Sequence, residues 1–393
     1  MYDKNLLVIT NSYPDKSNEY IGNIFVKEQV EYLKQYFNRI YVVSPVAYGV
    51  EYIRGTHHED YSYENVDVFF PKYVNIPICY FHSREVWVHL EKQAVLKLIR
   101  RKNLDIDIMH AHFAWPSGAV GAALKRELQL PLVITHHARP LTLQAEITQA
   151  DSMLRRMWQE CDAIIRIKQG DLDLFEQIGV SLDKIYYVPD GFDPKKFPHM
   201  DKTHCRNILG LPSHKFILFS LSTLTEVKGH RYSVEAVAKI CQKRKDILYI
   251  IGGSGPLKDQ IADQIRELKL QEHVRLIGHV PHNQLAVWMN ACDIFVLPSL
   301  GEGFGIVQIE ALSCGKPVVA TYNGGSEEII ISKEYGLLCK PADANDLSDK
   351  ISLALDINWN SRAIMEYAGK FTWEQIAKDL YNVYSQIISD SDE

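Results

Sequence analysis

The sequence predicts an α/β protein made of two doubly wound domains, each built on a parallel sheet. Three observations lead to this fold class. The chain has 393 residues, which is long for a single hydrophobic core. Short apolar runs alternate with helical patterns along most of it, as in sheets assembled from βαβ units. A cluster of turn residues over 189–194, with the sequence PDGFDP, interrupts this alternation near the middle.

Six apolar runs are expected as strands before this interruption and five after it. They are Leu6–Thr10, Ile40–Val43, Ile106–His110, Leu132–Thr135, Ala163–Ile167, Ile185–Val188, Phe216–Leu221, Leu248–Ile251, Val274–Ile277, Ile294–Leu297 and Val318–Thr321. Continuous apolar runs of this length are typical of parallel strands that are buried on both faces. We therefore expect a first domain over 1–193, a linker over 194–213 and a second domain over 214–370.

The composition narrows the class of protein. Hydrophobic residues make up 46% of the chain and charged residues 23%, which is typical of a soluble globular protein. The net charge of −6 lacks the basic excess of a nucleic-acid-binding domain. The seven cysteines include no Cys-x-x-Cys pair, so we expect reduced thiols and no metal centre. No apolar run has transmembrane length and no signal-peptide core is present, which predicts a cytoplasmic protein.

The most informative motif is LPSLGEGFGIVQIEALSCGKPVVA, residues 297–320. An apolar strand stops at Pro298, and glycines follow at alternate positions. A helix is then expected from Ile306 to about Cys314, with Gly315 as its C-cap. A strand, a glycine-rich loop and a helix start in this order let the backbone come close to a ligand.

This motif has the chemistry of a site for a phosphate and a sugar. The free N–H groups at the expected helix start attract an anion; they belong to Phe304, Gly305 and Ile306. Glu302 in the loop and Glu310 in the helix carry carboxylates, each of which can accept two sugar hydroxyls. Solvated glutamates on a flexible turn are the alternative, and the surrounding glycines and strands favour the site.

The motif resembles the signature of the retaining glycosyltransferases of family four, which have the GT-B fold of two Rossmann-like domains facing each other across a cleft. By this resemblance Glu302 lies near the donor sugar and its phosphates, and Glu310 binds the ribose of the nucleotide. The backbone of Gly303, Phe304 and Gly305 would contact the sugar and the diphosphate. The resemblance covers nearly the whole chain and is strongest over 214–340.

Other segments of the second domain resemble the same family. Lys228 follows the first strand of this domain, and the resemblance places it at the diphosphate that leaves; a surface lysine is the alternative. The family usually has an arginine about five residues earlier, where this chain has Thr223. Either Lys228 supplies more of the charge stabilisation, or Arg231 substitutes. The remaining donor-binding positions that the resemblance implies are Gly253, Gly255 and Val280, with structural turns as their alternative.

Histidines follow two strands of the first domain, where ligands of doubly wound sheets bind. His110 is best explained as a buried core residue. His137 resembles the family histidine that contacts the donor sugar and the acceptor side, although His136 could exchange roles with it. We assign His112, His136 and Arg139 to the acceptor side.

Three further expectations concern Gly22, the C-terminal segment and a basic segment of the first domain. Gly22 precedes a helix start and, by the resemblance, closes over the diphosphate of the donor. The segment 371–393 resembles the last helix of the family, which returns to the first domain. Residues 87–102 form a basic amphipathic pattern, which predicts a surface helix or, alternatively, an edge that touches an anionic membrane.

The predicted function is a retaining transfer of a sugar from a nucleoside diphosphate sugar to a hydroxyl of a glycan or lipid-linked acceptor. A UDP-sugar is the first choice of donor and GDP-mannose the second, and no metal or other cofactor is expected. The form GNIFVKEQV, residues 22–30, is similar to a branch that makes cell-surface polysaccharide, such as lipopolysaccharide or capsule, at the cytoplasmic face of the membrane. The alternatives are a GT-B epimerase or phosphorylase, and a non-catalytic sugar-nucleotide sensor.

Overall fold

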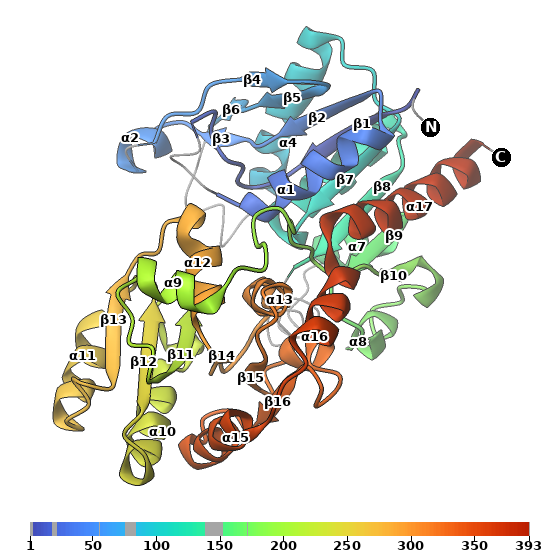
Figure 1. The fold of residues 1–393 in the computed structure, drawn as a ribbon. Helices are drawn as coiled ribbons and strands as arrows, with labels where there is room; N and C mark the ends of the chain where they lie inside the picture. The colour runs from blue at the N-terminus through green and yellow to red at the C-terminus, as the bar shows by residue number, and fades with distance from the viewer. Residues whose placement is uncertain are drawn as a thin grey trace. The chain divides into compact units, whose positions relative to one another are not determined.

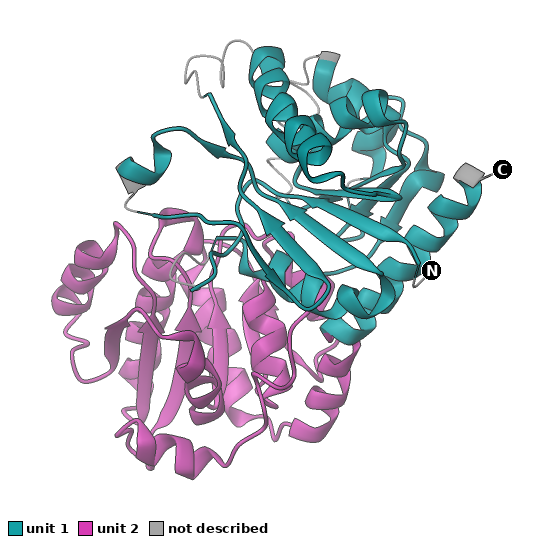
Figure 2. Cartoon of the chain, turned by 90° about the horizontal axis from the view of Figure 1, so that it is seen from above, with its two compact units in different colours: residues 1–190, 373–393 teal, residues 191–372 magenta. Residues whose placement is uncertain are grey.

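The computed structural model describes residues 3–17, 22–54, 56–74, 84–137, 152–170 and 172–392. The chain forms two compact units (Figures 1 and 2). Unit 1 comprises residues 1–190 and 373–393, and unit 2 comprises residues 191–372. Each unit is an α/β structure around its own sheet, so the predicted fold class of two parallel-sheet domains is confirmed.

The main sheet of unit 1 has the strand order β10-β9-β8-β7-β1-β2-β5-β4. Its strands are β1 (Asn5–Ile9), β2 (Arg39–Val43), β4 (Tyr61–Tyr63), β5 (Val66–Phe69), β7 (Ile108–His112), β8 (Leu132–His136), β9 (Ala163–Arg166) and β10 (Ile185–Tyr187). All neighbours pair in parallel except β4 with β5. Two short strands, β3 (Val46–Ala47) and β6 (Lys72–Tyr73), pair separately.

Helices cover both faces of this sheet because successive strand residues point to opposite sides. Leu7 and Ile9 face a core with α4, α5, α7 and α8, whereas Leu6 and Val8 face a core with α1 and α17. The helices of unit 1 are α1 (Ile24–Leu33), η1 (Lys34–Tyr36), α2 (Val50–Arg54), α4 (Arg84–Lys102), η2 (Ala114–Gly118), α5 (Ala119–Leu128), α7 (Ser152–Glu160), α8 (Leu172–Glu176), η3 (Leu182–Lys184) and α17 (Trp373–Asp392).

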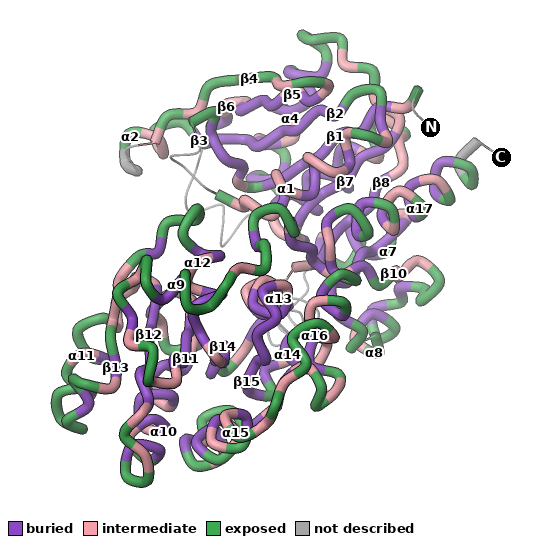
Figure 3. The backbone as a smooth tube through the Cα atoms, viewed as in Figure 1, coloured by how far each residue is buried: buried purple, intermediate pink, exposed green. Residues whose placement is uncertain are grey.

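The sheet of unit 2 is entirely parallel, with the order β13-β12-β11-β14-β15-β16. Its strands are β11 (Phe216–Leu221), β12 (Ile247–Gly252), β13 (Val274–Gly278), β14 (Ile294–Leu297), β15 (Val318–Thr321) and β16 (Gly336–Cys339). Five of them are almost wholly buried, as Figure 3 shows by their purple colour, whereas in the edge strand β13 only Val274 is buried.

The helices of unit 2 also lie on both faces of the sheet. They are α9 (Lys202–Ile208), η4 (Glu226–Lys228), α10 (His230–Lys243), α11 (Lys258–Glu267), η5 (His282–Gln284), α12 (Leu285–Ala291), α13 (Ile306–Ser313), α14 (Ser326–Ile329), α15 (Ala344–Asp356), α16 (Ser361–Ala368) and η6 (Gly369–Phe371). A core under α10, α11 and α15 covers one face. On the other face Phe219 stacks on Trp288 of α12.

The predicted strands agree with the structure over most of each sheet, including the edge strands β10 and β13, whose expected ends differ by one residue from those observed. The bounds of β11, β14 and β15 are those expected. The strand expected over Ile106–His110 was placed too early, because the structure has β7 over Ile108–His112. The five strands β3, β4, β5, β6 and β16 were not predicted. Their length does not explain this, because β5 and β16 have four residues each, like the predicted strands β14 and β15. β4 and β5 form a hairpin that turns at Glu64, with φ +46.

Candidate active site

Three loops meet at the carboxyl-terminal edge of the unit 2 sheet. They follow β11, β12 and β14. Gly229 lies against the loop after β14, since a Cβ at this position would stand 2.1 Å from the carbonyl oxygen of Pro298. The N–H of Leu300 donates to the carbonyl of Val227 at 2.7 Å. The edge where ligands of such sheets bind is therefore a closely joined backbone surface.

Lys228 and Glu302 meet on this surface. The Lys228 Nζ lies 2.7 Å from Oε1 and 2.9 Å from Oε2 of Glu302. The Ser299 hydroxyl donates to the same Oε1 at 2.6 Å. The Glu302 residue is only 7% exposed, so its carboxylate needs these donors to offset the cost of its burial. The ammonium of Lys228 is thereby held at the strand edge, where an anionic ligand group would compete for it.

Helix α13 begins directly after this pair. Its N-cap, Gly305, has φ +92, a left-handed conformation that favours glycine, and it caps the helix with no side chain. The first N–H groups of α13 therefore remain available to an anion. Glu310 is half-buried on α13, and Phe304 is buried before it. The structure thus places Glu302, Gly303, Gly305, Ile306 and Glu310 on one loop-to-helix step.

The glycine loop after β12 is shaped by close backbone packing. Gly253 has φ +132, and a Cβ there would lie 1.8 Å from the carbonyl oxygen of Ser222. Gly255 has φ +159, and its Cβ would lie 2.4 Å from the carbonyl oxygen of Leu224. Only glycine fits at these two positions, so the loop after β12 lies against the loop after β11.

The remaining predicted positions of unit 2 differ in exposure. Thr223 is exposed in the loop after β11. Arg231, the possible substitute for the missing arginine, is exposed, and its guanidinium lies 4.8 Å from the centre of the Tyr232 ring. Val280 is buried, and its side chain lies against Gly252. Among these three, Thr223 and Arg231 present polar groups to solvent, and Val280 contributes apolar surface.

The sequence did not single out the turn after β15. Asn323 accepts from the N–H groups of Gly325 and Ser326 at 3.1 and 2.9 Å. Glu327 accepts from the N–H of Gly324 at 2.9 Å. This turn supports the site, because the backbone carbonyl of Asn323 accepts from the N–H of Glu302 at 3.0 Å. The Gly324-Gly325 pair before a helix was the available signal.

Ser222 and His230, close to Lys228, are a second pair that the sequence did not single out. His230, the first residue of α10, is buried, and its Nε2 lies 2.8 Å from the Ser222 hydroxyl. Burial, together with the nearby positive charge of Lys228, lowers the pKa of His230 to about 4. Because His230 is neutral, the positive charge at this part of the site is carried by Lys228.

Four histidines of unit 1 divide between the two faces of its sheet. His110 is buried, with Nε2 2.6 Å from the Thr135 hydroxyl and Nδ1 2.7 Å from the Tyr384 hydroxyl, which agrees with a core role. The Nδ1 of His112 lies 3.0 Å from Nε2 of His137. The face of Thr135 in β8 therefore carries His110, His112 and His137 together.

His136 lies on the opposite face. Its Nδ1 lies 2.9 Å from the guanidinium of Arg166, and its ring meets Trp158 edge to face. His136 is buried in the core with α7. The alternation of side chains along a strand thus separates His136 from His137.

Two predicted positions of unit 1 lie near the limits of the described residues. Gly22 is exposed, with φ +50, and a Cβ there would lie 2.6 Å from the Ser12 hydroxyl. It precedes α1, whose N-cap is Asn23. Arg139 falls outside the described residues.

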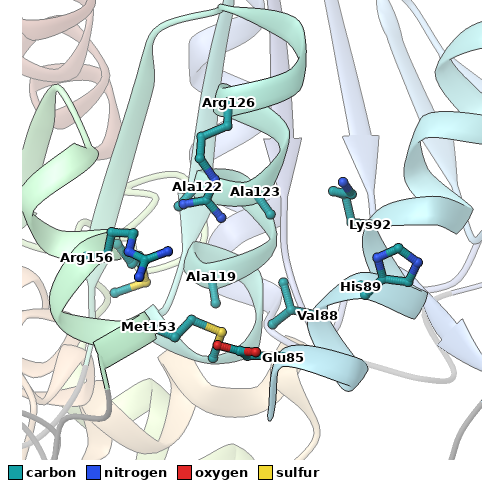
Figure 4. A pocket seen from close by; sticks show the side chains of 11 residues that line it. Glu85, Val88, His89, Lys92, Ala119, Ala122, Ala123, Arg126, Met153 and Arg156 are labelled. Atoms are coloured by element: carbon teal, nitrogen blue, oxygen red, sulfur yellow. The ribbon is translucent and has the colours of Figure 1, made fainter. Parts of the chain in front are cut away.

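The segment predicted as a basic amphipathic pattern is helix α4. Its side chains line a cavity of about 290 Å³ with those of α5 and α7, which Figure 4 shows from close by. Two of the basic side chains around it are paired: Lys92 with Glu127 at 2.8 Å, and Arg126 with Glu160 at 2.6 Å. These pairs reduce the net positive charge of the cavity rim.

Among the residues that the structure describes, no group of three or more His, Cys, Asp or Glu side chains is arranged to hold a metal ion. No described helix is long and apolar enough to cross a membrane.

Two family models match the chain. The model "Glycosyl transferases group 1" matches residues 201–371, and "Glycosyltransferase Family 4" matches residues 23–196. Among curated proteins, D-inositol 3-phosphate glycosyltransferase 1 of Catenulispora acidiphila is 28% identical over 72% of this chain and 73% of its own length. The D-inositol 3-phosphate glycosyltransferase of Corynebacterium jeikeium is 29% identical over 75% of each chain.

Solved structures show the same fold at lower identity. Sucrose-phosphate synthase from Thermosynechococcus elongatus is 22% identical, with a TM-score of 0.79 over 98% of this chain and 100% of its own. HepE of Anabaena, in complex with UDP, is 21% identical, with a TM-score of 0.74 over the same shares. Since the two models together span residues 23–196 and 201–371, the chain belongs to the family-four glycosyltransferases, retaining enzymes of GT-B fold that transfer a sugar from a nucleotide sugar.

Proposed function

We propose that this enzyme uses a UDP-sugar and transfers its sugar to a hydroxyl of a glycan or lipid-linked acceptor in the synthesis of surface polysaccharide. The choice of base is supported by the similar structures of HepE, which were solved in complex with UDP and with UDP-glucose. GDP-mannose is the second candidate donor. The acceptor and the polysaccharide pathway rest on the sequence resemblance described above.

The observation that carries the proposal is the pairing of Lys228 with Glu302 beside the uncapped start of α13. A cation and the N–H groups at the start of a helix suit the diphosphate of a nucleoside diphosphate sugar, and two carboxylates suit the hydroxyls of its sugar and its ribose. We assign the diphosphate to Lys228 and to the start of α13. We assign the sugar to Glu302 and the ribose to Glu310, whose carboxylates accept hydroxyl groups.

In the proposed reaction the bond between the anomeric carbon of the donor and its β-phosphate oxygen breaks. The acceptor oxygen forms the new bond on the same face of the sugar, and its proton passes to the departing diphosphate. Negative charge grows on that diphosphate, and Lys228 and the N–H groups of α13 stabilise it. For this, Lys228 exchanges at least part of its contact with Glu302 for the phosphate oxygens.

Unit 1 is proposed to bind the acceptor. His112 is the last residue of β7, His137 directly follows the neighbouring strand β8, and Gly22 precedes α1 in the same unit. We assign to His137 the contact with the reacting sugar, and to His112 a place on the acceptor side. His136 contributes to the core instead, because Arg166 and Trp158 enclose its ring.

The test is nucleoside diphosphate release by the purified chain from a panel of UDP-, GDP- and ADP-sugars, with a membrane extract as acceptor. We expect release from a UDP-sugar, and a loss of roughly 10²-fold or more in Glu310→Ala. The control is Glu272→Ala, which removes an exposed carboxylate elsewhere in unit 2. Release from a GDP-sugar alone would show that the donor is a GDP-sugar and not a UDP-sugar. Nucleotide binding without release from any donor would favour a non-catalytic sugar-nucleotide sensor.

A further inference from the structure

The structure holds both ring nitrogens of His137 against protein groups. Its Nε2 lies 3.0 Å from Nδ1 of His112. Its Nδ1 is buried without a hydrogen-bond partner among the described residues, and Oδ1 of Asp190 lies 3.6 Å from it, a contact between charges rather than a hydrogen bond. The ring also packs against Phe25 and Phe113, with centroid distances of 4.9 Å to each. The Asp190 residue is only 6% exposed, so its charge is largely removed from water. Asp190 belongs to the turn segment that the sequence indicated only as a domain boundary.

We propose that Asp190 is a positioning residue for His137, which keeps the proton of this histidine on Nδ1 and turns the Nε2 lone pair toward His112. A carboxylate can only accept, so it favours the tautomer with a proton on the facing nitrogen. With the proton on Nε2 instead, the lone pair of Nδ1 would oppose a buried carboxylate. Protonation of His137 would leave Nδ1–H in place, so Asp190 selects the same arrangement in both charge states.

The contact with His112 then has only one direction in the neutral state. Since Nε2 of His137 is an acceptor, Nδ1 of His112 must donate to it. The Nε2 of His112 is buried without a hydrogen-bond partner among the described residues, and this direction leaves it as a lone pair. Either direction buries one N–H without a hydrogen bond, at Nε2 of His112 or at Nδ1 of His137. Only at Nδ1 of His137 does this N–H face a carboxylate, so the charge of Asp190 favours the chain from His112 through His137 to Asp190.

The surroundings keep this chain from rearranging. His110 packs on His112 with a ring distance of 4.3 Å, and the hydroxyls of Thr135 and Tyr384 occupy its two nitrogens. Burial lowers the pKa of His110 to about 3 and that of His112 well below the usual range, so both stay neutral. His137 is therefore the histidine of this group that Asp190 can influence directly.

This inference rests on the proposed function only for its catalytic consequence, namely that Nε2 of the oriented His137 exchanges its contact with His112 for a hydroxyl of the sugar during transfer. The tautomer itself is measurable without any activity. The experiment uses the full chain labelled with ¹⁵N-histidine, at about pH 8 where a free imidazole is neutral. Long-range ¹H–¹⁵N correlations identify the protonated nitrogen, and the spectrum of His137→Gln assigns the residue.

We expect His137 to be protonated on Nδ1 in the unmodified chain and to change to the Nε2 form in Asp190→Ala. The control, Asp173→Ala, removes an exposed carboxylate of α8 in the same unit and should leave the spectrum unchanged. Asp190→Asn keeps an acceptor oxygen of the same size, so it should retain the Nδ1 proton even if the alanine variant folds poorly. An Nε2 proton in the unmodified chain, or no change in a folded Asp190→Ala, overturns the proposal.

The effect of Asp190 on catalysis is measured in a separate experiment, through kcat and KM. Asp190→Ala should lower kcat by roughly 10- to 100-fold, with a smaller change in the KM of the donor. Asp190→Asn should recover most of the rate. If His137 carries its proton on Nδ1 in the unmodified chain and kcat is nevertheless unchanged in Asp190→Ala, the positioning role of Asp190 is contradicted. If the unmodified chain releases nucleotide from no donor, the proposed function fails and the tautomer result still stands.

Discussion

Lys228 and Glu302 lie 74 residues apart in the chain, and their side chains form an ion pair with two hydrogen bonds. The sequence predicts each of them through its own motif, because each follows an apolar strand. Nothing in the spacing predicts that they touch, since this depends on β11 and β14 being neighbours in the sheet. Ser299 and Asn323 were missed for the same reason. Their role is to hold Glu302, and only the folded loops bring them to it.

Lys228→Met separates the two roles of this lysine. We expect sugar transfer to fall by roughly 10²- to 10³-fold, because the leaving diphosphate loses its cation. The chain should also lose about 1–3 kcal/mol of unfolding free energy, since a buried Glu302 carboxylate loses a partner. Urea unfolding and nucleotide release measure the two effects. In Lys228→Met with Glu302→Gln, stability should return while activity stays low. Recovery of activity in this double variant would contradict the assigned role.

Gly253→Ala tests the close packing of the two loops after β11 and β12. The new methyl group would meet the carbonyl oxygen of Ser222 at 1.8 Å, and the backbone would be held at φ +132. We expect a loss of about 1–3 kcal/mol or more, because the loops must move apart. Gly369→Ala is the matched control, since nothing lies within 4 Å of its Cβ position and its φ is −56. Equal thermal unfolding temperatures for both variants would contradict this packing.

At the scale of whole elements, the sequence predicts the strands that form apolar runs, including the edge strands β10 and β13, and it misses β4 and β5 of unit 1 and β16 of unit 2. The strands β11, β14 and β15 are buried on both faces, so they appear as uninterrupted apolar runs. The edge strand β4 has the residues Tyr61, Ser62 and Tyr63, which mix polar and apolar character. Its pairing with β5 supplies the reason for its conformation. The assignment of His137 over His136 remains a prediction, although the alternation of sides along β8 gives it a physical basis that the sequence already contained.

Helix α4 contains a buried carboxylate, which makes the stability of unit 1 depend on pH. Glu91 is 2% exposed and accepts from the indole N–H of Trp87 at 3.1 Å. Burial raises the pKa of Glu91 to about 8, so the folded chain binds a proton there that the unfolded chain releases near pH 4. The contribution of Glu91 to stability is therefore complete below about pH 4 and is lost as the pH rises toward 8, with a slope of up to about 1.4 kcal/mol per pH unit.

Glu91→Gln should remove this slope. We expect the unfolding free energy of the variant to change less than that of the unmodified chain between about pH 5 and pH 8, and to be higher at the upper end. Urea unfolding at both pH values measures it. Glu85→Gln changes an exposed glutamate of the same helix and should leave the slope as it is. The same slope in both variants would mean that Glu91 is ionised in the folded chain.

At the scale of the whole molecule, unit 2 is inserted into unit 1. Unit 1 is completed only by α17, whose residues Trp373, Leu380 and Tyr384 are fully buried in the core with α1. The two ends of unit 2 lie together, because the N–H of Phe192 donates to the carbonyl of Phe371 at 2.9 Å and Phe192 pairs with Thr372. The domain boundaries at 193 and 370 expected from the sequence stay a prediction. Turn residues in the sequence indicate where the chain passes from unit 1 to unit 2. The return of the chain to unit 1 was predicted only from the family resemblance of the segment 371–393.

This insertion predicts that the two units behave differently when the chain is cut. The fragment 191–372 keeps its whole sheet, its joined ends and every predicted donor-binding residue except Gly22, so it should fold alone. We expect it to bind UDP without transferring sugar, because His112 and His137 are missing from it. The fragment 1–190 should fail to fold, since it exposes the face of the sheet that α17 covers. Adding residues 373–393 through a short linker should restore it. Circular dichroism and calorimetric titration with UDP measure these outcomes, and a stably folded fragment 1–190 would show that α17 is dispensable to the core it completes.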